Sequence, residues 1–453
     1  MQIRLMLAVW ACKLAIFGSR LLGKKGSSMP GQLAFKICPK VLKLLSQQVK
    51  KEIIVVCGTN GKTTTNNILS SFIKAQGYRV ICNSVGANML WGVCCAFAEK
   101  ANLLGKLKAD YACIEVDEAS CVKVFPHMKP HLMVITNLFR DQLDRYGAID
   151  QTADLLKRAL AISPETKLLL NGDDPQVAQF GENTDRVCYY MGVDADAGMT
   201  KEDAQEGQLC MFCGAPLEYE YHHYSQLGKF TCPGCSFKRK PLDFRVTEVL
   251  MNEGLSFKLE HNGKTEKFAV NYRGFYNVYN IVLSYAAATL VMGEVPDYQK
   301  VLAAYKPQVG RMETFSINKP VILNMAKNPA GFNQAIATVS QDTKEKDILI
   351  AVNDKPSDGI DVSWLWDVDF ERLLGGNVNR VVVSGMRADE LMLRLKYAGF
   401  NEEQQIKCRT LKEAADAAVN GAGSVCYMLA NYTAVFTLQE ILKDMEGKSA
   451  HGE

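Results

Sequence analysis

The stretch "EIIVVCGTNGKTTTNNILSSFIKAQG" (residues 52–77) says most about the architecture of this protein. A run of β-branched residues leads into a glycine-containing loop, and a helical pattern follows it. Glycines let backbone N–H groups close around phosphate oxygens, and the N-terminus of the following helix adds its dipole. The general phosphate loop has one more glycine, where this chain has Val56. The pattern still predicts a nucleotide-phosphate loop made of Gly58, Thr59, Asn60, Gly61, Lys62, Thr63 and Thr64.

Two side chains of this loop carry the chemistry. The Lys62 ammonium can neutralise a terminal phosphate, and the Thr63 hydroxyl can bind Mg²⁺. A glycine-rich turn without a ligand is the alternative, but a lysine followed by three threonines is a poor choice for a bare turn.

The composition indicates a folded protein of two to four domains: 453 residues, 48% hydrophobic and 22% charged. The net charge of +3 is too small to argue for nucleic acid as a partner. Most of the 15 cysteines stand alone in apolar runs, as do Cys57, Cys82, Cys113 and Cys426. We interpret these as buried free thiols in a reducing cytoplasm.

Strand-like and helix-like segments alternate over residues 51–175, which predicts a parallel sheet covered by helices. A cysteine-rich insert interrupts the pattern at 200–245, and a second α/β rhythm follows residue 318. We therefore expect an α/β protein with three parts. These are an N-terminal helical segment (1–45), a central domain (46–317) with an insert at about 205–240, and a C-terminal α/β domain (318–453).

The first 23 residues are apolar and basic. Arg4, Lys13 and Arg20 interrupt the apolar run, so no window of about 18 apolar residues is left to span a bilayer. A signal peptide also needs an uninterrupted apolar centre and a small-residue cleavage site. We expect an amphipathic helix packed on the first domain, and a helix resting on the inner membrane face is the alternative.

The insert contains Cys210-x2-Cys213 and, after 18 residues, Cys232-x2-Cys235. This spacing is typical of a zinc ribbon, in which four thiolates close a tetrahedral structural site. Two disulfides are the alternative, and they fit poorly with a reducing compartment. His222 and His223 lie midway in the gap, and we expect them on the hairpin surface rather than among the ligands.

Five motifs in order resemble the Mur ligase family, which includes the folylpolyglutamate synthases. All five follow the loop "GTNGKTTT", which itself has the form of the family's ATP loop: "EVDEAS" (115–120), "TNLFRDQLDRYG" (136–147), "NGDDP" (171–175), "GFYNVYNIVLSYAAA" (274–288) and "GRMETF" (310–315). The resemblance implies a Mur-ligase-like fold and ATP and Mg²⁺ as cofactors. It also implies that Glu115 binds Mg²⁺ with Thr63, that Asn277 lies by the adenine, and that Arg311 contacts the nucleotide.

The chemistry implied by this resemblance is acyl activation. A substrate carboxylate attacks the γ-phosphate of ATP to give an acyl phosphate, and an amine then displaces phosphate and forms an amide. Lys62, Thr63 and Glu115 with Mg²⁺ would supply the positioning and charge neutralisation that the first step needs.

Three departures from the family pattern matter. Gln142 stands where the family has a metal-binding histidine, so a second Mg²⁺ site is in doubt. Lys157 has the spacing of the family's carbamylated lysine but sits in a charged helix, and we expect a solvated surface lysine. The third domain begins "MAKNPAGFN" (325–333) where amino-acid-adding ligases carry "AHNP".

The four-cysteine insert and "DGIDVSWLWDVDFE" (358–371) resemble one subgroup of the family, the MurT subunits of lipid II isoglutaminyl synthases. This resemblance covers residues 5–445. It implies a heterodimer with a GatD-like class I glutaminase that supplies ammonia. The substrate would be the D-glutamate α-carboxylate of the lipid II stem peptide, which becomes D-isoglutamine.

The resemblance also implies that Asp361 completes a Cys-His-Asp triad with the cysteine and histidine of the partner. Asp354, Asp358 and Asp361 all follow a predicted strand, at the edge where α/β sites form, and the sequence does not choose among them. Trp364 and Trp366 fit either an interface or the core.

Two other functions compete with this one. An amino-acid-adding Mur ligase or a folylpolyglutamate synthase-like ligase would share the ATP loop, but Gln142 and the cysteine insert count against it. A non-catalytic ATP-binding scaffold is the other, and the intact Lys62, Thr63 and Glu115 count against that.

Overall fold

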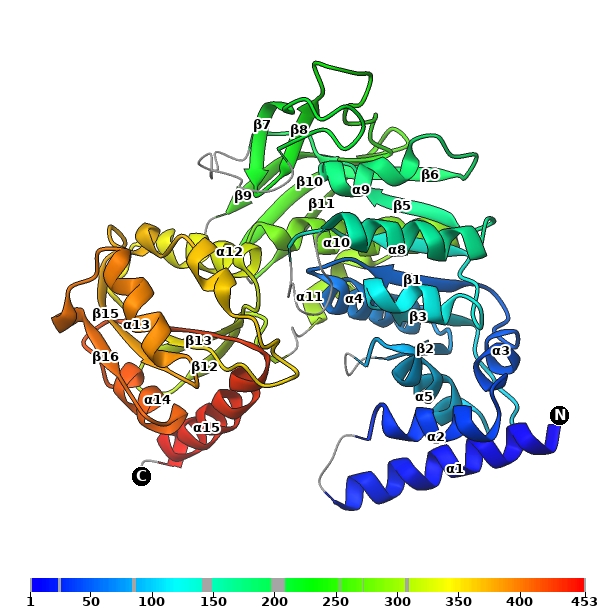
Figure 1. The fold of residues 1–453 in the computed structure, drawn as a ribbon, viewed down its shortest axis with the longest axis horizontal. Helices are drawn as coiled ribbons and strands as arrows, with labels where there is room; N and C mark the ends of the chain where they lie inside the picture. The colour runs from blue at the N-terminus through cyan, green and yellow to red at the C-terminus, as the bar shows by residue number, and fades with distance from the viewer. Residues whose placement is uncertain are drawn as a thin grey trace. The chain divides into compact units, whose positions relative to one another are not determined.

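The structure is a computed structural model that describes residues 2–22, 26–83, 87–140, 149–196, 208–251, 254–271, 273–305 and 309–451. The chain divides into two compact units (Figure 1). Unit 1 comprises Met1–Phe139, Ile149–Asn271 and Tyr276–Tyr305, and unit 2 comprises Arg140–Ala148, Tyr272–Phe275 and Lys306–Glu453. The domain boundary predicted at residue 317 therefore falls inside unit 2, because the strand at 313–316 pairs within the second sheet.

Over its described residues, unit 1 is built on a nine-stranded sheet with the order β11-β10-β9-β6-β5-β4-β1-β3-β2 (Figure 1). Neighbouring strands in the run β9-β6-β5-β4-β1-β3-β2 are parallel, whereas β9, β10 and β11 form an antiparallel meander. The parallel sheet predicted for residues 51–175 is confirmed. The strands are β1 Ile53–Cys57, β2 Val80–Cys82, β3 Tyr111–Glu115, β4 Leu132–Ile135, β5 Lys167–Asn171, β6 Cys188–Val193, β9 Phe244–Met251, β10 Leu255–His261 and β11 Lys264–Val270.

Helices cover this sheet because their apolar residues recur every three or four positions. In α8 (Ile149–Ile162), Ala153, Leu156 and Leu160 enter the core beside the strands. Helix α4 (Lys62–Ala75) packs on β3 and against α10 (Tyr276–Met292). Among the described residues after position 87, unit 1 also has the short helices α5 Leu90–Lys100, η1 Glu118–Ser120, α6 Cys121–Val124, α9 Pro175–Ala178, η2 Gln179–Gly181 and α11 Tyr298–Ala304.

The N-terminal segment forms α1 (Gln2–Leu21), α2 (Met29–Ile37) and α3 (Val41–Ser46), which pack with α5 on the rest of unit 1. One face of α1 enters the core through Leu5, Ala8, Val9, Cys12 and Ile16. The helix packed on the first domain, as expected from the sequence, is therefore present, but its outer side carries apolar side chains as well and is not the polar face of an amphipathic helix.

The insert forms a hairpin of β7 (Glu218–Tyr224) and β8 (Leu227–Thr231). The expectation that both histidines lie on its surface is wrong for His223, which is buried with its Nε2 3.1 Å from the carbonyl oxygen of Val193. Burial lowers the pKa of His223, so this imidazole is neutral. His222 stacks on Tyr219 with ring centroids 3.8 Å apart.

Unit 2 has, over its described residues, a six-stranded sheet with the order β12-β13-β17-β14-β15-β16, parallel except for β12. Two apolar cores, one with α12 and α13 and one with α14 and α15, cover it. Its strands are β12 Glu313–Ser316, β13 Pro320–Met325, β14 Lys346–Ala351, β15 Val378–Ser384, β16 Gln405–Lys407 and β17 Val425–Ala430. Its helices are α12 Pro329–Ser340, η3 Ser363–Asp367, η4 Phe370–Leu373, α13 Ala388–Tyr397, η5 Glu402–Gln404, α14 Leu411–Val419 and α15 Tyr432–His451.

The cysteines predicted as buried free thiols are free, and Cys57, Cys113 and Cys426 are buried. Cys82 is only partly buried, because β2 is the edge strand of its sheet.

Candidate functional site

The loop between β1 and α4 depends on its two glycines. Gly58 and Gly61 have φ angles of 123° and 83°, a region that favours glycine. A Cβ atom at Gly58 would lie 2.3 Å from the Thr136 Oγ1, and one at Gly61 would lie 2.1 Å from the Asn280 Oδ1. Both glycines are therefore required by backbone conformation and by close packing.

Residues that follow β4 hold the loop in place. The Thr59 N–H donates to the Asn137 carbonyl (2.8 Å), and the Asn60 N–H donates to the Asn137 side-chain oxygen (2.8 Å). The Asn60 carbonyl accepts from the Thr136 hydroxyl at 2.7 Å. Because β1 and β4 pair in parallel, Thr136 and Asn137 leave the sheet at the same edge as the loop. The "TN" motif therefore shapes the loop through its hydrogen bonds.

Lys62 starts α4 and is buried. Its ammonium donates to the carbonyls of Gly58 and Thr59 and lies 3.3 Å from both Glu118 carboxylate oxygens. Burial opposes its positive charge, but the carboxylates of Glu118, Asp117 and Glu115 outweigh burial and raise the pKa of Lys62. Lys62 is therefore a fixed cation at the mouth of the loop.

Thr63 and Glu115 form the second polar pair. The Thr63 hydroxyl donates to the Glu115 carboxylate at 2.7 Å, and the Asn88 amide donates to the other carboxylate oxygen at 3.0 Å. The pairing of Val56 with Glu115 places the ends of β1 and β3 side by side. A hydroxyl and a carboxylate at this separation are the hard oxygen ligands that Mg²⁺ prefers, so the residues present fit that ion.

Glu118 is a further member of this cluster, and it is not among the site residues predicted from the sequence. It lies three residues after Glu115 in η1, is buried, and is the carboxylate that faces Lys62. The motif "EVDEAS" contains the residue, but three acidic side chains in six residues do not reveal which one turns toward the lysine.

Asn277, predicted to lie by the adenine, is buried on α10 and receives a hydrogen bond from the Asn280 amide at 3.3 Å. Asn280 in turn contacts Gly61 and accepts from Thr65, so the structure brings this part of α10 to the loop. Arg311 belongs to unit 2, in the turn before β12, and its contact with a nucleotide stays a prediction.

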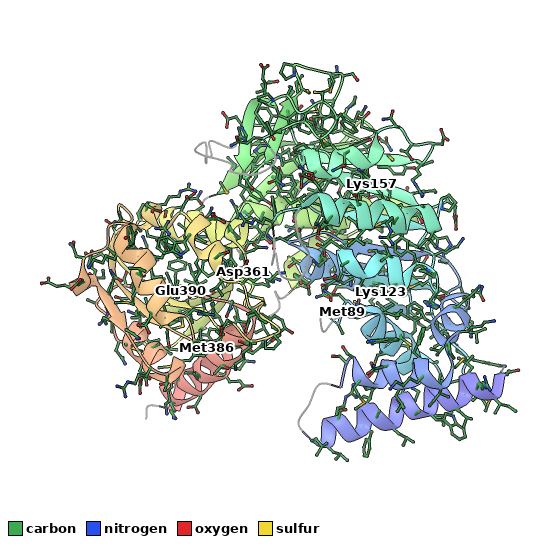
Figure 2. The ribbon with its side chains drawn as sticks, in the orientation of Figure 1. Met89, Lys123, Lys157, Asp361, Met386 and Glu390 are labelled. Carbon is green, nitrogen blue, oxygen red and sulfur yellow. The ribbon has the colours of Figure 1, made fainter. Side chains whose placement is uncertain are left out.

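Gln142 and Lys157 are the two residues that bear on a second metal site, and the structure describes one of them. Gln142 lies outside the described residues. Lys157 is exposed on α8, as the surface interpretation expects (Figure 2).

The "NGDDP" motif forms hydrogen bonds with the segment after β4 that positions the phosphate loop. The Asn171 amide donates to the Thr136 carbonyl (2.9 Å), and the Asp174 carboxylate accepts from the Leu138 N–H (2.9 Å) and caps α9. Burial raises the pKa of Asp174 to about 7, against the effect of the N–H groups that donate to it. This motif acts on the site through Thr136 and Leu138.

The four insert cysteines converge. Their Sγ atoms all lie within 4.8 Å of one another, with 3.6 Å between Cys210 and Cys235 and 3.4 Å between Cys213 and Cys232. Tetrahedral zinc with Zn–S bonds of about 2.3 Å needs sulfur atoms about 3.8 Å apart, whereas a disulfide needs about 2.05 Å. The four thiols therefore fit one tetrahedral metal ion.

The three candidate aspartates after β14 have different surroundings. Asp358 is buried, and its two oxygens accept from the Thr433 N–H (2.7 Å) and hydroxyl (2.5 Å). Asp354 pairs with the Arg387 guanidinium at 2.7 Å. Asp361 is half-buried and accepts from the Ser363 N–H at 2.9 Å, which lowers its pKa (Figure 2). Asp358 is therefore held in the interior by Thr433 and Asp354 is held by Arg387 in a partly exposed ion pair, whereas Asp361 bonds to the backbone N–H of its neighbour Ser363.

The two tryptophans differ in burial. Trp364 is buried against Phe332 in the core of unit 2. Trp366 is 46% exposed and meets the ring of Tyr397, with centroids 5.6 Å apart. Unit 2 carries exposed apolar side chains on α13, just before it, and in the segment that follows β14, and we name this set the α13 patch. It consists of Ile360, Trp366, Met386, Leu393 and Tyr397.

Two family profiles match the chain: the Mur ligase middle domain over residues 56–288 and the MurT ligase C-terminal domain over residues 325–435. The chain is 36% identical over 393 residues to the lipid II isoglutaminyl synthase (glutamine-hydrolyzing) subunit MurT of Staphylococcus aureus, covering 86% of this chain and 87% of the relative. It is 32% identical over 424 residues to the subunit of the same name from Streptococcus pneumoniae, with 92% of each chain covered.

Solved structures share the fold. A pseudomurein peptide ligase type C from Methanothermus fervidus has a TM-score of 0.67 at 23% identity, covering 89% of this chain and 80% of that one. MurF ligase from Thermotoga maritima has a TM-score of 0.65 at 13% identity, covering 92% and 84%. The fold is thus that of the Mur ligases, and with the two sequence relatives it shows that the chain belongs to the MurT family.

Proposed function

We propose that this chain is the synthetase subunit of a glutamine-dependent amidotransferase of peptidoglycan synthesis. It would use ATP to convert the D-glutamate α-carboxylate of the lipid II stem peptide into the amide, D-isoglutamine. The observation that carries the proposal is the cluster of Lys62, Thr63 and Glu115 at the ends of β1 and β3.

In the proposed reaction a carboxylate oxygen attacks the γ-phosphorus of ATP, and ADP leaves. Ammonia then attacks the carbonyl carbon, phosphate leaves, and the nitrogen gives up a proton to form the amide. Negative charge lies on the phosphoryl oxygens in the first step and develops on the carbonyl oxygen and the leaving phosphate in the second, and a fixed cation and oriented N–H groups stabilise such charge.

The residues of the loop have separate tasks in this scheme. Lys62 would release its contacts with the Gly58 carbonyl and Glu118 and pair with the transferred phosphoryl group. Thr63 and Glu115 would hold Mg²⁺, whose charge offsets that of the phosphates. Asn88 would keep the Glu115 carboxylate oriented toward that ion.

The four insert cysteines would hold one Zn²⁺. Cys210 and Cys232 are buried with Phe230 and Phe237 in a small apolar core. A metal with four protein thiolates has no open coordination position, so its task would be to fold the insert.

The partner would be a GatD-like class I glutaminase that binds unit 2. The α13 patch offers exposed aromatic and aliphatic anchors of the kind that protein interfaces bury. Asp361 lies next to Ile360 of this patch, so its carboxylate would be able to orient a histidine of the partner.

The test is the ATP-dependent amidation of lipid II by the purified complex with a glutaminase subunit. Lys62→Ala should lower the amidation rate by at least about 10²-fold, because one charge contact in the transition state is lost. Lys74→Ala, at an exposed position on the same helix, is the matched control and should keep the rate. Normal amidation by Lys62→Ala would refute the proposal.

A second variant removes an ambiguity of the first. Lys62→Ala leaves the buried Glu118 carboxylate without its cation, which can destabilise the fold by about 3–5 kcal/mol. The double variant Lys62→Ala/Glu118→Gln removes both charges. It should fold more stably than Lys62→Ala and remain inactive, which would assign the loss to the ammonium.

A further inference from the structure

Helix α1 is apolar on two opposite sides. Its inner side is buried in unit 1, but large apolar side chains also recur on the outer side at intervals of three or four residues. In chain order, each of the first five of these outer side chains is followed two positions later by a buried residue, which lies about half a turn away around the helix. We name this set the outer stripe: Ile3 (73% exposed), Leu7 (48%), Trp10 (43%), Leu14 (71%), Phe17 (64%) and Leu21 (73%).

A second apolar feature adjoins the outer stripe. Leu103 and Leu104 are 58% and 55% exposed in the turn after α5. The Trp10 indole N–H donates to the Leu103 carbonyl at 2.7 Å, which ties this turn to α1. Exposed Lys100, Lys106 and Lys108 flank the turn.

Charge around these apolar features is strongly one-sided. Residues 1–51 contain ten of the 52 lysine and arginine residues of the chain and none of its 49 aspartate and glutamate residues. The rest of the chain is acidic on balance. Arg20 does pair with Glu99 of α5 at 2.8 Å, and Lys13 donates to the backbone carbonyl of Glu99. The segment nevertheless keeps a large positive excess.

The helix does not have the surroundings of a membrane span. The expectation that no apolar window long enough to span a bilayer is left is wrong by length and composition alone, because an 18-residue window of α1 is apolar enough despite its basic residues. However, 33% of that window is buried in unit 1, and Arg4, Lys13 and Arg20 are spread along it. Crossing a bilayer would remove Leu5, Val9 and Cys12 from the core.

We propose that the outer stripe and the Leu103–Leu104 turn dock on an anionic lipid surface, with α1 lying in the plane of the headgroups. Apolar side chains on one side of a helix with basic residues beside them are the features of such interfacial helices. Anionic lipids attract each nearby lysine or arginine, whereas two copies of so basic a segment would repel each other. The charge of the segment therefore selects a lipid surface over a second copy of the chain.

Flotation of the full chain with vesicles tests the proposal. Phosphatidylcholine vesicles that contain phosphatidylglycerol should carry the protein at low salt, pure phosphatidylcholine vesicles should carry much less, and added salt should weaken binding. Leu14→Gln/Phe17→Gln should lower binding to the anionic vesicles at least about tenfold, because two inserted apolar side chains are lost. Leu250→Gln, at a 50% exposed position on β9, is the matched control and should bind normally.

Three outcomes would overturn the proposal. The wild-type chain could fail to float with anionic vesicles, or the double variant could float as well as the wild type. Alternatively, light scattering could show a dimer that the double variant loses, which would make the outer stripe an interface between copies. Because Leu14 and Phe17 are exposed, thermal unfolding of the double variant should match the wild type, so weaker flotation would not report misfolding.

Discussion

Replacing Asp361 with asparagine should stop glutamine-dependent amidation and leave the fold intact. The Asp361 carboxylate is half-buried and accepts a 2.9 Å hydrogen bond from the Ser363 N–H, which an amide oxygen also accepts. We therefore expect the free energy of unfolding to change by less than about 0.5 kcal/mol. The same N–H lowers the pKa of Asp361, so the wild-type side chain is ionised at neutral pH.

The kinetic loss should be much larger than the loss of stability. A carboxylate that orients a catalytic histidine accepts its ring N–H and stabilises the imidazolium, and an amide can leave the histidine in the wrong tautomer. Loss of this carboxylate in a Ser-His-Asp triad lowers kcat by about 10⁴-fold, and we expect a loss approaching that size here. Ammonium added at high concentration should restore the product, because it bypasses glutamine hydrolysis.

Asp358→Asn is the matched control, three residues away. Both Asp358 oxygens accept hydrogen bonds from Thr433 in the interior, whereas an asparagine has one oxygen for the Thr433 N–H and an amide nitrogen that only donates, so the Thr433 hydroxyl would lose its present acceptor and have to turn. This variant should lose about 1–3 kcal/mol of unfolding free energy, measured by urea denaturation. The folded protein of this variant should amidate lipid II at the wild-type rate, both with glutamine and with ammonium as the nitrogen source.

Two results would refute the role of Asp361. Full glutamine-dependent activity of Asp361→Asn would show that the carboxylate does not orient the partner, and Asp354 would be tested next. A variant that ammonium does not rescue, with lowered stability, would make Asp361 a structural turn residue like Asp358.

Three further predictions concern the loop, the insert and the pH dependence of stability. Gly61→Ala should lower ATP affinity and amidation together, because its Cβ would lie 2.1 Å from the Asn280 Oδ1, and isothermal titration with ATP should detect the change. Cys210→Ser should lose the single zinc ion per chain in elemental analysis and destabilise the insert, whereas Cys188→Ser should keep the metal; freshly purified wild-type protein without zinc or iron would contradict the site. The pKa of Asp174 is raised by burial to about 7 from about 3.9 in the unfolded chain, so its contribution to stability is full below pH 4 and disappears as the pH rises through 7. The unfolding free energy of the wild type relative to Asp174→Asn should therefore fall by about 1 kcal/mol between pH 5 and pH 6, and a constant difference would show that Asp174 is ionised in the folded state.

Features that depend on neighbouring residues could be predicted from the amino-acid sequence. The strand, glycine loop and helix over residues 53–75 follow from periodicity and from glycines at the required positions, and the structure has them. The cysteine spacing predicted a cluster of four thiols, which the structure brings within 4.8 Å. The charged residues of the first segment predicted a helix packed by one face, as α1 is.

Tertiary packing sets which of several chemically similar side chains face the site or the core. It selected Glu118 as the partner of Lys62, buried Trp364 while exposing Trp366, and committed Asp358 to the interior. It also buried His223, which sequence spacing had assigned to a hairpin surface. Burial depends on segments far apart in the chain, such as residues 358 and 433, that meet only when the sheet is complete. Local sequence patterns therefore predict secondary structure and metal ligands that lie close together in the chain. The contact partner of a given side chain depends on the packed fold.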